Sequence, residues 1–197
     1  MTQPVRGDQD RNYLLSVGDG VTFAIGMAFA SGTAILPLYV AHYDVPRWVV
    51  GLIPAIFMLG MQLPQVLGAA VRARQATFWG PFRRQIFAPR LALLLMACTS
   101  LLPGEMALYG FFALFAAFAL ACGFQAPMWM EYIAHLIPAE RRGRFFGLRL
   151  TLGGLGSLAA SWLSAVLLDR LGHPLGFAAC FWLAALFVLA GFVMEIS

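Results

Sequence analysis

Long runs of apolar residues, separated by short polar segments, dominate the chain. Six of these runs approach the length of about 20 residues that a helix needs to cross a bilayer. They are Tyr13–Ala41, Trp48–Val71, Ile86–Leu102, Ala107–Met130, Phe145–Leu168 and Pro174–Met194. Strands of a membrane barrel would instead alternate over segments of about ten residues, which we do not find. The pattern predicts an all-α bundle of six transmembrane helices over residues 13–197, preceded by a tail of residues 1–12.

Two of the six runs depart from the simple pattern. The first is longer than a membrane crossing requires, so we expect it to tilt or bend, with Pro37 as the site of a kink. The third is short and begins awkwardly at Pro89 and Arg90. We expect the long side chain of Arg90 to reach back to the lipid headgroups.

Small residues recur at helical spacing and predict which helices pack closely, because helices in lipid approach through small side chains. The first run carries Gly18, Thr22, Gly26, Ala30 and Ala34, and the fifth carries Gly153, Ser157, Ser161 and Ala165 beside Gly156, Ala160 and Ser164. The fourth run has Ala119 and Gly123 before Pro127. The sixth run is rich in phenylalanine, including Phe177, Phe181 and Phe192. We therefore expect helices one, four and five to pack tightly and helix six to face lipid.

Composition agrees with a membrane protein. Hydrophobic residues make up 61% of the chain and charged residues only 11%, and the mean hydropathy is +0.79. Soluble domains carry about 25% charged residues. This balance excludes a soluble enzyme, a disordered tail and a nucleic-acid-binding domain. The cysteines, Cys98, Cys122 and Cys180, lie in apolar runs without metal-ligand spacing, so we expect no disulfide, metal or cofactor.

The basic residues predict the orientation. All of them are arginines, and the formal net charge is +4. If the N-terminus is cytoplasmic, every arginine except Arg47 and Arg170 falls on the cytoplasmic side, as the positive-inside rule requires. The sequence thus predicts a multi-pass protein of the plasma (inner) membrane with both termini in the cytoplasm.

The connection between the fourth and fifth runs carries the most informative motif. It reads Pro138-x-x-x-Arg142-Gly143-x-x-x-Gly147. Proline disfavours helix in the residue before it, and Gly143 permits a tight turn. In motif, loop and predicted sidedness this segment resembles the major facilitator superfamily of transporters. The six-helix layout with both ends inside also resembles one half of that family's twelve-helix fold.

The resemblance implies a specific architecture. The chain would be the N-terminal six-helix half, built from two inverted three-helix repeats, with helices one and four lining a cavity. The family's signature between helices two and three departs here, because Arg72 stands where the family has an acid. The sequence therefore lacks the acid that interlocks the two halves. Alternating access needs two halves, so we expect a separate C-terminal half or a homodimer.

Polar residues inside the runs are the candidates for ion or substrate binding, since ionisable groups are costly within a bilayer. Asp19 would bind a proton, a cation or a substrate amine, or else pair with Arg11 or Arg149 in a wet cytoplasmic mouth. Gln62 and Gln125 would line a polar cavity or bond to neighbouring helices.

Charged residues near the motif are candidates for gating. Glu131 directly follows the fourth run, at the end of the predicted helix, where a salt bridge to Arg142 or Arg144 is favoured over proton coupling. Arg149 enters the fifth run and would pair with Glu131 or Asp19. With Pro138, Arg142, Gly143 and Gly147, these residues form the predicted loop and gating set.

Rival classes lack their motifs. The chain has no G-x-S-x-G serine protease motif, no His-Glu-x-x-His and no Walker loop. A channel stays open as an alternative, although no filter-like repeat is visible. We expect no catalytic residues. The favoured function is secondary active transport of a small solute, with proton coupling as one option. The alternative is a non-transporting membrane scaffold or an inactive fragment.

Overall fold

The computed structural model describes residues 6–196, with side chains for residues 10–195. These residues form seven helices. They are α1 (Arg6–Phe29), α2 (Ile35–Ala41), α3 (Arg47–Ala73), α4 (Trp79–Thr99), α5 (Glu105–Leu136), α6 (Ala139–Leu171) and α7 (Leu175–Ile196). Residues 1–5 of the predicted tail lie outside this described part, and the rest of that tail forms the beginning of α1. The all-α prediction is confirmed.

The first predicted run is broken into α1 and α2 rather than kinked at Pro37. The break falls at residues 30–34, where Ser31, Gly32 and Thr33 form a turn. Pro37 lies in the first turn of α2, where a backbone N–H has no partner within the helix. Pro37 is therefore compatible with the beginning of a helix, and the predicted kink there is wrong.

Four of the described helices, α3, α5, α6 and α7, are long and apolar enough to cross a membrane. Helices α1 and α4 are long, but their sequences are more polar. The first turns of α1 are charged, and α4 contains Arg83, Arg84 and Arg90. The polar parts of α1 and α4 are therefore the places where packing must compensate for charge.

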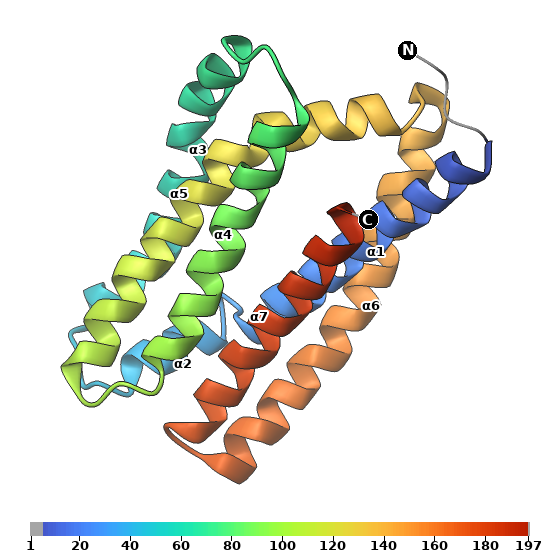
Figure 1. The fold of residues 1–197 in the computed structure, drawn as a ribbon. Helices are drawn as coiled ribbons and strands as arrows, with labels where there is room; N and C mark the ends of the chain where they lie inside the picture. Colours follow the sequence, from blue (N-terminus) through green and yellow to red (C-terminus); the bar gives the residue numbers. More distant parts are fainter. Residues whose placement is uncertain (1–5, 197) are drawn as a thin grey trace.

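The helices assemble into two groups (Figure 1). One group contains α1, α6 and α7, and the other contains α3, α4 and α5. Helix α1 packs along α6 and α7, just as α5 packs along α3 and α4, while α4 and α7 join the two groups. Exchanging α1, α3 and α4 with α5, α6 and α7 leaves this pattern of contacts unchanged. The α1–α6 contact then corresponds to the α5–α3 contact, the α1–α7 contact to the α5–α4 contact, and the α4–α7 contact to itself.

Helix α7 is more buried than predicted, and the expectation that it faces lipid is wrong. In its most apolar window 44% of the residues are buried, against 17% for α6. Phe181 is fully buried, because α7 lies between α1 and α4. Gly26 of α1 faces Ala184 and Val188 of α7. The stripe of small residues on α1 thus packs against α7, whose side chains are larger.

The predicted close packing of helices one and five is confirmed by the contacts between α1 and α6. Helix four, α5, packs mainly against α3 and α4 instead, so the prediction that grouped it with helices one and five is wrong. The Ser157 hydroxyl donates a hydrogen bond to the Ala24 carbonyl across α6 and α1, at 3.1 Å. Gly153 also faces Ala24, since a Cβ added there would lie 3.0 Å from the Ala24 methyl. The small residues of the fifth run therefore let α6 approach the backbone of α1.

Helices α3 and α5 also approach to backbone contact. A Cβ added at Gly123 would collide with the Gly60 carbonyl and lie 2.7 Å from the Met61 carbonyl. A Cβ at Gly68 would likewise collide with the Phe124 carbonyl. Both glycines are buried in the helix interface. Their missing side chains set the distance between α3 and α5.

Candidate functional site

Four charged side chains meet in the interior of the bundle. Arg90 of α4 donates from Nη2 to Asp19 Oδ1 of α1 at 3.1 Å and to Glu195 Oε2 of α7 at 2.9 Å. Arg149 of α6 lies 3.6 Å from Asp19 Oδ2. The side chains of Asp19, Arg90 and Glu195 are at most 4% exposed. These four residues, called the charge cluster below, bring together two carboxylates and two guanidinium groups and so have no net formal charge.

The surroundings hold both arginines in place. Arg90 Nη1 donates to the Ile86 carbonyl one turn earlier at 2.6 Å, and its guanidinium lies over the Phe192 ring. The Arg149 guanidinium lies over the Trp129 ring of α5, 4.6 Å from its centroid. A Cβ at Gly20 would collide with the Arg149 side chain, so this glycine gives the arginine its path to Asp19. These contacts hold the two guanidinium groups beside the carboxylates with which they pair.

A cavity of about 340 Å³ lies beside the charge cluster, within the range of small-molecule pockets. Its polar lining comes from Asp19, Arg90, Arg149 and Gln125. Its apolar lining comes from Phe23, Met27, Phe57, Met61, Ile86, Phe118, Cys122, Ala126 and Trp129. Helices α1 and α5, the predicted helices one and four, supply most of these residues. We call this space the central cavity.

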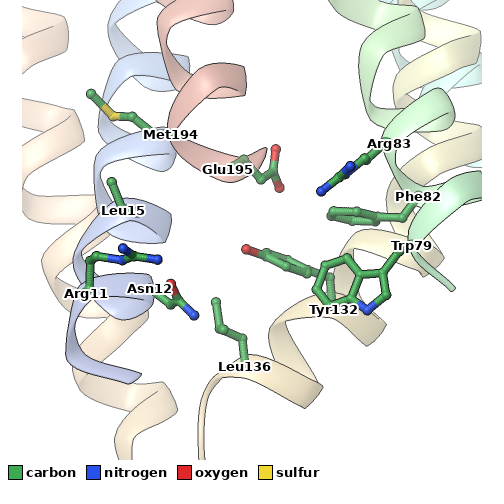
Figure 2. A pocket seen from close by; sticks show the side chains of 10 residues that line it. All are labelled: Arg11, Asn12, Leu15, Trp79, Phe82, Arg83, Tyr132, Leu136, Met194 and Glu195. Carbon is green, nitrogen blue, oxygen red and sulfur yellow. The ribbon is translucent and has the colours of Figure 1, made fainter. Parts of the chain in front are cut away.

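A second pocket of about 340 Å³ lies where α1 begins and α7 ends. Figure 2 shows Arg11 and Asn12 of α1 on one wall, and Arg83 and Phe82 of α4 on the other. The Glu195 carboxylate and the Tyr132 hydroxyl point into the space between them (Figure 2). We call it the end pocket. Arg90 connects the two spaces, because it contacts Glu195 on one side and Asp19 on the other.

Some polar atoms at these sites lack a hydrogen-bond partner among the described residues. They are Arg149 Nη1, Arg90 Nε, Gln125 Oε1 and Glu195 Oε1, and all are shielded from solvent. Buried polar atoms in proteins are nearly always paired with protein or water. The residues that carry these atoms line one of the two spaces, so rotation of their side chains would expose the unpaired atoms to a bound molecule or water.

The predicted site residues separate into three places. Asp19, Gln125 and Arg149 meet at the central cavity, and the predicted pairing of Asp19 with Arg149 is confirmed. Gln62 is exposed on α3, and among the described residues its side chain accepts a hydrogen bond only from Gln65 of the same helix, at 3.5 Å. Glu131 lies apart from the charge cluster, near the end of α5.

Glu131 pairs with Arg72 rather than with Arg142 or Arg144. Arg72 Nε and Nη2 each donate to one Glu131 oxygen at 2.8 Å, joining the ends of α3 and α5. The predicted pairing within the loop is therefore wrong. The signature that the sequence resembles between helices two and three has an acidic residue where this chain has Arg72. Here the acidic residue of the pair is Glu131 on the neighbouring helix α5.

The motif of Pro138 to Gly147 opens a helix. Pro138 is the N-cap of α6, and Ile137 before it is extended. Arg142 donates to the carbonyls of Ile137 and Ala134, both at 3.0 Å, and so closes the end of α5. Gly143 and Gly147 lie inside α6 with open space where a side chain would project. The predicted tight turn at Gly143 is wrong, because the chain turns at Ile137 and Pro138 and is already helical at Gly143.

Arg90 and Glu195 are the site residues that sequence reasoning missed. The prediction that Arg90 reaches the headgroups is wrong, since its side chain is 4% exposed. The usable signal was an arginine near the start of an apolar run, which is costly within a membrane unless it is paired. Glu195 stands at the end of the last run, where an acid gives no such signal.

Charge reversal tests the Arg72–Glu131 pair. We expect Arg72→Glu to lower the stability by about 1 kcal/mol, because two carboxylates would then face each other in place of a two-pronged ion pair. The double variant Arg72→Glu/Glu131→Arg should recover most of this loss in thermal unfolding of the detergent-solubilised protein. Arg74→Glu, at an exposed neighbouring position, is the control. A double variant no more stable than Arg72→Glu would contradict the pairing.

Comparison with known protein families places the chain in a family of membrane proteins. A sequence-family model described as Major Facilitator Superfamily matches residues 20–196, from the middle of α1 to the end of α7. No curated protein and no solved structure matches the chain.

Proposed function

Since this chain belongs to the major facilitator superfamily, a family of multi-pass membrane transporters and not of enzymes, we propose that it is one six-span half of a secondary transporter. It would move a small solute by alternating access, together with a second half or a second copy of itself. In this arrangement the substrate binds near the bilayer midplane between the halves. The central cavity would be this half's share of that binding site.

The observation that carries this proposal is the buried charge cluster beside the central cavity. Ionisable side chains within membrane spans are costly, and they mark ion and substrate pathways by default. Here Asp19, Arg90 and Glu195 are buried, and Asp19 and Arg90 also line the central cavity. A purely structural bundle could replace such a cluster with apolar residues at no loss of stability.

The arrangement of helices supports six spans and two inverted repeats. Helices α1 and α2 together would form the first span, and α3 to α7 the other five. The packing pattern that maps α1, α3 and α4 onto α5, α6 and α7 is the one expected of two related three-helix units. Because each unit crosses the membrane an odd number of times, the two would have opposite orientations.

The distribution of arginines supports cytoplasmic termini in an inner membrane. Figure 1 shows the beginning of α1, the end of α7, the α3–α4 loop and the α5–α6 connection toward one end of the bundle. Most arginines lie on these segments, whereas Arg47 and Arg170 lie toward the opposite end. We assign the arginine-rich end to the cytoplasm. The end pocket would then open toward the cytoplasm.

Within this proposal Asp19 is the coupling residue and protons are the coupling ions. Gln125 and Arg149 would act with Asp19 on the solute. Glu131, Pro138 and Arg142, with Gly143 and Gly147, would position the cytoplasmic ends of α5 and α6 during gating. Gln62, on the outer face of α3, would contact solute only where another chain covers it.

A transport assay with Asp19→Asn tests the proposal. The purified chain is reconstituted in liposomes that contain a pH-sensitive dye, and solutes of different classes are added outside. We expect one class of solute to drive proton entry. Asp19→Asn should reduce the initial rate at least tenfold, because the amide can neither take up and release a proton at this position nor form an ion pair with arginine. Asp169→Asn, at an exposed position on α6, should leave the rate unchanged. If proton entry were undiminished in Asp19→Asn, the coupling role of Asp19 would be refuted. If no solute drove proton entry in the unmodified chain, the alternative of a non-transporting membrane scaffold would be favoured.

A further inference from the structure

The polar end of the central cavity has an excess of positive hydrogen-bond donors. Both Asp19 oxygens face arginines, Oδ1 at 3.1 Å from Arg90 and Oδ2 at 3.6 Å from Arg149. Arg90 is shared further with Glu195 at 2.9 Å, which lies on the side of the end pocket. Asp19, the acid that lines the central cavity, is therefore paired at both oxygens, whereas Glu195 keeps Oε1 without a partner among the described residues, on the side of the end pocket.

Arg149 is the least satisfied member of the charge cluster. Its ion-pair distance to Asp19 exceeds ordinary hydrogen-bond length, and its Nη1 has no partner among the described residues. Its guanidinium is stacked on Trp129, which fixes its plane at the cavity wall. A guanidinium held in this way can bind an anion by donating charge-assisted hydrogen bonds, which are among the stronger polar contacts in proteins.

Gln125 lies on the same cavity and adds a second polar contact. Its Oε1 also has no partner among the described residues. The side-chain amide carries both donors and an acceptor, so rotation about its last bond can present the amide Nε2 to an anionic oxygen. Arg149 and Gln125 could thus hold the two oxygens of one carboxylate.

The rest of the cavity is apolar and aromatic. Phe23, Phe57 and Phe118 line it, together with Met27 and Met61. A sugar would leave most of its hydroxyl groups without partners on such a wall, at a cost for each buried polar group. A cationic amine would meet two arginines and an aspartate that is already paired. A carboxylate with an apolar body has few polar groups to leave unpaired, and its charge is opposite to that of the arginines.

We propose that the central cavity binds a small amphipathic monocarboxylate, with its charge on Arg149 and Gln125 and its apolar body against the phenylalanine and methionine wall. This inference rests on the proposed transport function and names its substrate class. The volume of about 340 Å³ limits the ligand to a small molecule, such as a single-ring acid or a short aliphatic acid.

Trp129 provides a binding assay that does not depend on transport. Its indole lines the cavity and touches Arg149, so an anion that engages Arg149 should change its fluorescence. The purified full chain in detergent is titrated with benzoate, benzamide and benzylamine, which share one ring and differ in charge. We expect a saturable change with benzoate and at least tenfold weaker binding of the other two, because a charge-assisted bond is lost. Trp129→Phe should abolish the signal.

Two substitutions assign the effect to the arginine. Arg149→Gln should weaken benzoate binding about tenfold or more, while Arg149→Lys, which keeps the charge, should weaken it less. Arg170→Gln, at an exposed position on the same helix, should bind as the unmodified chain does. Equal binding of benzoate and benzamide by the unmodified chain, or undiminished binding by Arg149→Gln, would overturn the proposal.

The outcome separates this inference from the proposed function. Selective benzoate binding without proton-coupled uptake in liposomes supports the ligand class and counts against transport by this chain. Uptake of a sugar or an amine together with weak benzoate binding refutes the ligand class and leaves transport intact.

Discussion

Replacing Arg90 with methionine is expected to destabilise the protein by about 3–5 kcal/mol, because it leaves two buried carboxylates without their common partner. Methionine fills a similar volume with an apolar chain, so the loss reports the charge and not a cavity. Asp19 would keep only the 3.6 Å contact with Arg149, and Glu195 would lose its ion pair. Thermal unfolding in detergent, followed by tryptophan fluorescence, measures the change.

Matched variants separate charge from packing at this position. Arg84→Met, on an exposed face of α4, should unfold at nearly the temperature of the unmodified chain. The triple variant Arg90→Met/Asp19→Asn/Glu195→Gln should recover much of the loss, since the unpaired acids become neutral. If Arg90→Met unfolded no earlier than Arg84→Met, the three-residue ion pair would have no role in stability.

Adding a single methyl group at Gly123 is expected to cost about 1–3 kcal/mol. The new Cβ would collide with the backbone carbonyl of Gly60, which cannot rotate away as a side chain can. Helices α3 and α5 would have to separate along their whole interface. In thermal unfolding, Gly123→Ala should therefore lower the midpoint clearly.

Gly154→Ala provides the control for that substitution. Open space surrounds the position of its Cβ, and it too lies inside a long helix. Because alanine favours helix over glycine by about 1 kcal/mol, this variant should be as stable as the unmodified chain or more stable. Equal stability of the two alanine variants would show that α3 and α5 are not held at backbone contact.

Hydrophobic periodicity and length predicted the helices well, because a membrane span must satisfy its own backbone hydrogen bonds. The runs starting at Trp48, Ala107, Phe145 and Pro174 each became one helix. The ends differed, because polar turns such as residues 79–85 continue a helix beyond its apolar part. The break at residues 30–34 was missed, since small residues favour close packing and turns alike.

Partners across the bundle could not be predicted from the sequence. Asp19 was found because a carboxylate within an apolar run is conspicuous, but its main partner, Arg90, is distant in the chain. The choice of Arg72 over Arg142 for Glu131 depends on how α3 meets α5. The burial of α7 depends in the same way on its position between α1 and α4, which its own phenylalanines do not reveal.

The sharing of Arg90 has a thermodynamic consequence for the two spaces that it joins. Its Nη2 donates to Glu195 at the end pocket and to Asp19 at the central cavity, so one guanidinium divides its interaction between two acids. Whatever draws it toward Glu195 weakens its hold on Asp19. Linkage makes such an effect reciprocal and equal in free energy. A molecule that bound in the end pocket and drew Arg90 toward Glu195 would therefore change the affinity of the central cavity, and an affinity measured at one space would be defined only for a stated occupancy of the other.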